Sequence, residues 1–162
     1  MRRALCVVGL LCLSAAIAAA QGKVSSSSSC PGSASGQSYE VGDKPNHWYG
    51  LAQFKCTATS GEVAGVKDKE GMGTEFHEVV GGKSSGHGIF VATMANGDHV
   101  HYTYTNSVNL TEGMMTTGSN KFEITGGTGK FKAIKGKGGC TGKGNADGSS
   151  IWTCTGTYTG VK

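Results

Sequence analysis

The sequence predicts an all-β protein whose sheet closes into a small antiparallel barrel, and three observations support this fold class. Glycine accounts for 28 of the 162 residues, and toward the carboxyl end alternate positions carry Gly or an apolar side chain. Inward side chains crowd one another in a narrow barrel, and glycine relieves that crowding. Short runs rich in Thr, Val and Tyr are separated by turn residues, as in strands joined by tight turns. No stretch shows a helical apolar period.

Residues 1–20 are typical of a secretory signal peptide. A charged start, Met1-Arg2-Arg3, precedes an apolar run that ends in Ala18-Ala19-Ala20. We therefore expect a secreted or periplasmic protein whose mature part has no membrane span. Residues 21–38 are dominated by Ser and bury little, so we expect a flexible tail, followed by a barrel domain over residues 39–162.

The charge of the chain argues against nucleic-acid binding. The formal net charge is +4 and falls to +2 when Arg2 and Arg3 are removed with the predicted signal peptide. The remaining sequence contains lysine but no arginine. Arginine is the side chain that binds phosphate and guanine through two parallel hydrogen bonds, so its absence disfavours that class of partner.

Four cysteines remain after the predicted signal peptide: Cys30, Cys56, Cys140 and Cys154. An even number in an exported chain predicts disulfides, with three pairings possible. A hairpin centred near Asp147 would place Cys140 opposite Cys154, at a distance that suits a bridge. Cys30 with Cys56 then follows by elimination.

The first strands expected along the chain are Trp48–Thr59 and, after the break at Ser60-Gly61, an edge-like or bulged strand within Lys67–Val80. The paired carboxylates on the second segment, Glu75 with Glu78 or Asp68 with Glu70, are interpreted as solvated, because no feature of the sequence indicates burial.

A hairpin over Ile89–Thr105 is the clearest local pattern. Asn96-Gly97 is the preferred centre of a two-residue type I′ turn. Pairing outward from that turn places Val91 opposite Tyr102 and Ile89 opposite Tyr104, on the face that we expect to form the core.

The carboxyl-terminal part predicts further strands around Gly113–Thr117, over Lys121–Thr125 and Lys130–Gly139, and finally over Ile151–Thr159. The last two strands have the same division of residue types between their two faces. Apolar residues, Cys or Gly occupy one face, and Lys or Thr the other. The predicted inner residues are Ile134, Gly136, Gly138 and Cys140, opposite Trp152, Cys154, Gly156 and Tyr158.

The segment Ile124–Gly136, I-T-G-G-T-G-K-F-K-A-I-K-G, resembles the G-G-T-G-x-[FY]-x-x-[AI]-x-G signature of the allene oxide cyclase and dirigent β-barrel superfamily. The likeness extends to G-T-Y-T at Gly156–Thr159 and covers about a third of the chain. It implies a calycin-like, eight-stranded antiparallel barrel around an apolar interior. It also implies a small apolar or aromatic ligand, although fold alone does not fix function.

The residues expected to line or fill the barrel are aromatic, with one lysine at its mouth that could meet a ligand carboxylate: Trp48, Phe54, Tyr102, Tyr104, Trp152, Tyr158 and Lys132. His99 and His101 share one strand face, and this spacing raises metal binding as an alternative, with His47, His77 or His87 as a third ligand.

These observations predict a binding protein rather than an enzyme, with no cofactor and with oligomeric state and catalytic residues left open. The alternative is an isomerase or cyclase that acts on a lipid-like substrate. That alternative requires at least one buried ionisable group inside the barrel.

Overall fold

The computed structural model describes residues 21–33 and 35–161, and the predicted signal peptide lies outside them. Nine strands and one short 3₁₀ turn are found there. They are β1 (Gly22–Cys30), β2 (Ser35–Glu40), β3 (His47–Val63), β4 (Val66–Val80), β5 (Lys83–Met94), β6 (His99–Thr111), β7 (Met114–Gly127), η1 (Gly129–Phe131), β8 (Lys135–Gly144) and β9 (Ser150–Thr159).

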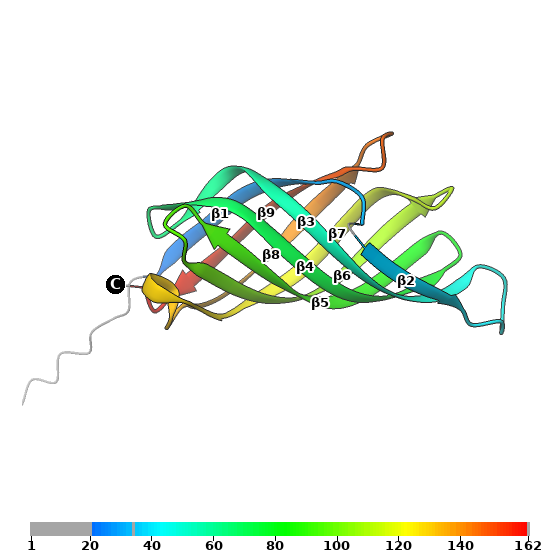
Figure 1. Ribbon diagram of the computed structural model, residues 1–162, viewed down its shortest axis with the longest axis horizontal. Helices are drawn as coiled ribbons and strands as arrows, with labels where there is room; N and C mark the ends of the chain where they lie inside the picture. The colour runs from blue at the N-terminus through cyan, green and yellow to red at the C-terminus, as the bar shows by residue number, and fades with distance from the viewer. Residues whose placement is uncertain (1–20, 34, 162) are drawn as a thin grey trace, which may run out of the picture.

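Eight of these strands form a closed antiparallel barrel, which confirms the predicted fold class (Figure 1). Strands β3 to β9 pair in chain order, and β1 closes the sheet by pairing with β9 on one side and β3 on the other. The ninth strand, β2, pairs with β3 beyond the end of β1, over the residues that precede Phe54. Figure 1 shows β2 and η1 at opposite ends of the elongated barrel.

The expectation of a flexible Ser-rich tail over residues 21–38 is wrong for Gly22–Cys30, which form β1. Its backbone pairs with two neighbours, Thr155 facing Ser25 on one side and Glu62 facing it on the other. Val24 and Cys30 are buried. Ordering this segment costs conformational entropy, and Ser side chains bury too little apolar surface to compensate for it. Backbone hydrogen bonds along both edges of β1 and the disulfide at Cys30 supply the stabilisation instead.

The β5–β6 hairpin forms as predicted, but its register differs by one residue. Phe90, not Val91, faces Tyr102. The loop is Ala95-Asn96-Gly97, closed by Met94 and Asp98, and Gly97 alone of these has positive φ, at 85°. This is a three-residue loop rather than a type I′ turn, which needs positive φ at two positions. The slip of one residue exchanges the two faces of β5, so Phe90 points inward and Ile89 outward, whereas Tyr102 and Tyr104 of β6 point inward as predicted.

The Gly-rich bend before β8 is longer than predicted. Residues 129–131 form η1, so the expected strand over Lys130–Gly139 begins only at Lys135. The turn brings Phe131 into the barrel, and both Phe131 and Ile134 are fully buried. Six buried apolar side chains from five strands join them in the core at this end of the barrel: Val24, Val63, Ala92, Met94, Val100 and Ile124.

Gly136 and Gly138 of β8 and Gly156 of β9 face the barrel interior, as predicted. A Cβ on Gly156 would lie 3.0 Å from the Phe122 ring, and one on Gly138 would meet the same ring. A Cβ on Gly136 would lie 3.0 Å from the Ile124 side chain. Glycine thus leaves the space that large side chains of β7 fill.

Both predicted disulfides are confirmed. Cys140 and Cys154 face each other across β8 and β9, and Cys30 joins β1 to Cys56 of β3. Within the described residues, no helix is long and apolar enough to cross a membrane.

Candidate functional site

A polar cluster lies inside the barrel, on the side of the core that is away from η1. Its centre is Glu75 of β4, whose side chain points inward and which is only 6% exposed. Tyr104 and Asn106 of β6 and His77 of β4 surround the carboxylate. The sequence-based interpretation of Glu75 as a solvated residue is therefore wrong.

The carboxylate of Glu75 is held by two uncharged donors. The Tyr104 hydroxyl donates to Oε2 at 2.9 Å, and Asn106 Nδ2 donates to the same oxygen at 2.7 Å. His77 Nδ1 lies 3.9 Å from Oε1, which is too long for a hydrogen bond. Because the His77 side chain is 20% exposed and that of Glu75 8%, the cluster meets solvent at His77.

Glycines on the neighbouring strands make room for this cluster. A Cβ on Gly86 would lie 3.0 Å from Glu75 Oε1 and 2.9 Å from Asn106 Oδ1. A Cβ on Gly88 would lie 2.8 Å from the Tyr104 hydroxyl, and one on Gly50 would meet the His77 ring. Any larger residue at these positions would displace a polar side chain, so the glycines and the cluster form one arrangement.

Burial changes the chemistry of two groups in the cluster. It raises the pKa of Tyr104 well above its usual value, and the charge and hydrogen bond of Glu75 raise this pKa further. Tyr104 therefore stays protonated and acts as a donor. Asn106 Oδ1 is buried and has no hydrogen-bond partner among the described residues. A buried acceptor without a donor costs free energy, which a ligand with a donor group could recover.

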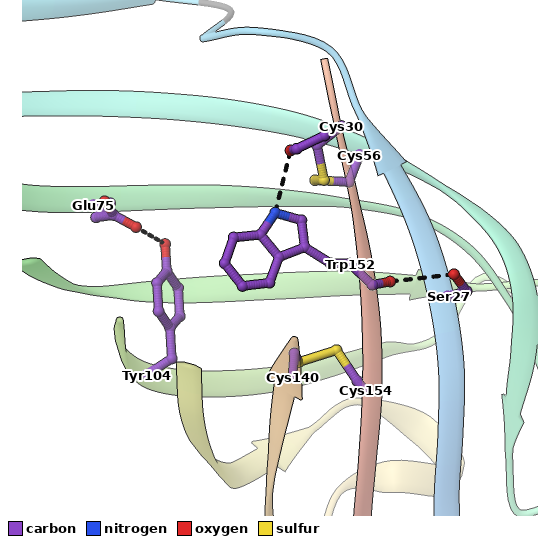
Figure 2. The surroundings of a disulfide bond; sticks show 9 residues. Ser27, Cys30, Cys56, Glu75, Tyr104, Cys140, Trp152 and Cys154 are labelled. Carbon is purple, nitrogen blue, oxygen red and sulfur yellow. Dashed lines mark hydrogen bonds between the residues drawn. A yellow bond between two sulfur atoms is a disulfide. The ribbon is translucent and has the colours of Figure 1, made fainter. Parts of the chain in front are cut away.

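Two disulfides and Trp152 lie beside the cluster. Figure 2 shows the Trp152 ring drawn between the two bridges, and Tyr104 turned so that its hydroxyl meets Glu75. The indole nitrogen donates to Ser150 Oγ at 3.2 Å. A Cβ on Gly142 would lie 2.8 Å from the indole ring. Glycine again admits a large inward side chain.

The residues predicted to line the barrel are placed differently from one another. Tyr102, Tyr104, Trp152 and Tyr158 pack against the core, and Phe54 is half-buried beside Gly73. Tyr102 makes edge-to-face contacts with Phe90 and Phe122. Trp48 is 37% exposed, and Lys132 is exposed directly after η1. Thus the Tyr residues and Trp152 all contribute to the interior of the barrel, whereas Trp48 and Lys132 are exposed.

The five described histidines do not form a metal-binding cluster. His99 and His101 alternate with the inward Val100 and Tyr102, so they lie on the outer face. In the described ranges, no group of three or more His, Cys, Asp or Glu residues is placed to hold a metal. His47 instead bridges two carboxylates, with Nδ1 2.5 Å from Asp43 and Nε2 2.8 Å from Glu78.

An open groove of about 1300 Å³ crosses the outside of the barrel. It runs from β4 to β9 and is lined chiefly by outward-facing residues, among them Phe76, Ile89, Lys121 and Lys137. Of the residues predicted to bind a ligand, only Tyr104 contributes to its lining.

One signal in the sequence could have revealed the cluster. Gly86 and Gly88 are alternate residues of β5 and face the same side of the sheet. Glu75 and His77 of the neighbouring strand β4 do the same. Pairing these two strands would have brought polar residues over glycines inside a barrel. Local sequence alone does not reveal the cluster, because the burial of Glu75 depends on the pairing of these two strands.

Fold and site together define a disulfide-linked, closed eight-stranded β-barrel with a buried polar cluster around Glu75 in its interior. A scan against known protein families found no family model that matches the chain, and a search of curated proteins found no match either.

Proposed function

We propose that this protein binds a small, largely apolar or aromatic molecule that carries a hydrogen-bond donor, such as a hydroxyl group, against Glu75 and Asn106. The observation that carries the proposal is the buried Glu75 carboxylate, which has two uncharged donors and, among the residues that the structure describes, no cation within hydrogen-bonding distance. Burying such a charge costs free energy, and the fold gains nothing from it that an apolar side chain would not supply. Buried polar groups that converge in an apolar interior are typical of binding sites.

The chemistry of the surroundings defines the ligand. Tyr102, Phe122 and Trp152 offer apolar and aromatic surface, while Glu75 and Asn106 Oδ1 offer acceptors only. A phenol or a hydroxylated apolar molecule satisfies both. The likeness to the allene oxide cyclase and dirigent superfamily supports the same ligand class. Two disulfides are compatible with a secreted or periplasmic location, where such bonds persist.

A matched pair of ligands tests the proposal. Calorimetric titration with a series of 4-alkylphenols should give saturable binding, and the corresponding methyl ethers, which lack the donor, should bind more weakly. A Glu75→Gln variant should weaken phenol binding about tenfold or more, because it removes a charged acceptor. Glu40→Gln changes an exposed carboxylate and serves as the control. Equal affinity for phenols and ethers, or no binding of either, would overturn the proposal.

The same cluster supports a second candidate, an isomerase or cyclase. A carboxylate and a hydroxyl that share a 2.9 Å hydrogen bond away from water could accept and return a proton. In that case Glu75→Gln would abolish turnover of a bound substrate. A binding protein would show no turnover in either form.

A further inference from the structure

The outer groove crosses several strands in one continuous row of outward side chains. Phe76 of β4 faces His87 of β5, which faces Thr105 of β6, and Thr105 faces Lys121 of β7. Lys121 in turn faces Gly139 of β8. Neighbouring strands lie about 4.8 Å apart, so Phe76 and Lys121 are separated by about 14 Å along the groove. A ligand that reaches both must be elongated.

One end of the groove is apolar. Phe76 is 58% exposed and Ile89 55% exposed, and they lie diagonally across the β4–β5 pair. The Phe76 ring stacks on His87 with 6.0 Å between ring centroids. On the strand before, Leu51 faces Phe76 directly and is also exposed. Adjacent exposed apolar side chains of this size are typical of a surface that binds a ligand or another macromolecule.

The middle of the groove is cationic. Lys121 and Lys137 line it, and within the described part of the chain neither has an acidic partner within 4 Å. Glu123 is the acidic residue in this lining and faces Lys137 across β7 and β8, whereas Lys121 lies between Thr105 and Gly139. Gly139, beside Lys121, presents no side chain and leaves room for a group to approach the ammonium. Two lysines with one glutamate leave this part of the groove with a net positive charge, which complements an anion.

We propose that this groove binds an elongated amphiphile with a carboxylate at one end. Its apolar chain lies on Phe76 and Ile89, and its carboxylate meets Lys121 and Lys137. The contacts of this site are made by outward-facing side chains, whereas Glu75 points inward, although Tyr104 of the Glu75 cluster also borders the groove. The inference therefore does not depend on the proposed function.

Titration calorimetry with dodecanoate, below the concentration at which it forms micelles, tests the site. We expect saturable binding that weakens with added salt, since the charges are exposed and screened. Phe76→Ala should weaken binding about tenfold through lost apolar contact. The Lys121→Met, Lys137→Met double variant should weaken it about threefold to tenfold and remove most of the salt dependence.

Matched surface variants control for general effects. Ile151→Ala and Lys143→Met alter exposed residues outside the groove and should leave the affinity unchanged. Glu75→Gln should also leave it unchanged. If Glu75→Gln weakens binding as much as Phe76→Ala does, the chain occupies the barrel interior and the groove proposal is wrong.

Two further ligands test the chemistry of the occupant. Dodecan-1-ol lacks the carboxylate, and equal affinity for it at low salt would refute the role of the lysines. A carboxylated oligosaccharide, hexagalacturonate, separates an acidic glycan from an acyl chain. Its binding without a requirement for Phe76, together with no binding of dodecanoate, would overturn the assignment.

Discussion

At the scale of single residues, the interior of this barrel depends on where side chains are missing. Gly86 and Gly88 face Asn106, Glu75 and Tyr104, and no Cβ fits between them. The alternation of glycine on the last two strands could be predicted from the sequence. Its partner residues on β4 to β7 could not, because they follow from cross-strand register, which differed from the expected register by one residue at β5 and β6.

The fit of Gly88 predicts a large effect of a single methyl group. In Gly88→Ala, the new Cβ would lie 2.5 Å from the Thr74 carbonyl and 2.8 Å from the Tyr104 hydroxyl. We expect a loss of about 1–3 kcal/mol in the free energy of unfolding, measured by urea denaturation. Gly32→Ala is the control, since its nearest neighbour would be at 3.7 Å. An equal, small effect of both changes would contradict the crowding seen around Gly88.

Asp68 predicts a dependence of stability on pH. Burial raises its pKa from 3.8 to about 6, and its Oδ1 is buried without a partner among the described residues. The folded state therefore holds this proton more tightly than the unfolded state. The protonated Asp68 therefore contributes fully to the free energy of unfolding below pH 4, and this contribution is lost as the pH rises through 6.

Comparison with Asp68→Asn isolates the effect. Between pH 4 and pH 7.5 the wild type should lose about 1–2 kcal/mol of unfolding free energy relative to the variant, a figure reduced because the carboxyl is partly solvated. Denaturation midpoints at several pH values measure it. Parallel pH profiles for the two proteins would show that Asp68 titrates normally.

At the scale of elements, the disulfides hold the barrel at two different places. The Cys140–Cys154 bridge joins adjacent strands of one hairpin, 14 residues apart. The Cys30–Cys56 bridge, with a separation of 26 residues, joins β1 to β3 where the sheet closes. The first pairing could be predicted from the hairpin alone. The second was predicted only by elimination, because the strand character of the Ser run was not recognised.

Removing each bridge should produce a different pattern of loss. Either paired Cys→Ser variant should lose about 3–3.5 kcal/mol in the chain-entropy account. Amide hydrogen exchange should speed up along β1 when Cys30 and Cys56 are replaced, and at the β8–β9 hairpin when Cys140 and Cys154 are replaced. The same exchange pattern in both variants would show that the barrel opens only as a whole.

At the scale of the whole molecule, closure depends on β1. Strands β3 to β9 form a continuous sheet whose two edges meet only through this strand, and Ser26 and Ser27 have partners on both sides. The closed barrel could be predicted from glycine and alternation. The identity of the closing strand could not, because Ser in a strand is recognised by its backbone partners rather than by its side chains.

Deleting residues 21–33 should therefore abolish cooperative unfolding. Without β1 two sheet edges are left unpaired, and inward residues such as Val63 and Tyr158 become exposed. The deletion is made together with Cys56→Ser, and full-length protein with both Cys30→Ser and Cys56→Ser is the control. Near-ultraviolet circular dichroism and thermal melts compare the two. A sharp melt of the shortened chain would show that β1 is an accessory strand.

The pairing of β1 with β9 also determines the order in which the chain can mature. Ser27 lies opposite Thr153, so β1 has to wait for a partner that is made 126 residues later. Contacts so distant along the polypeptide slow folding. Until β9 has been made, the nascent barrel has unpaired edges, and during that interval it is most exposed to aggregation and most dependent on chaperones.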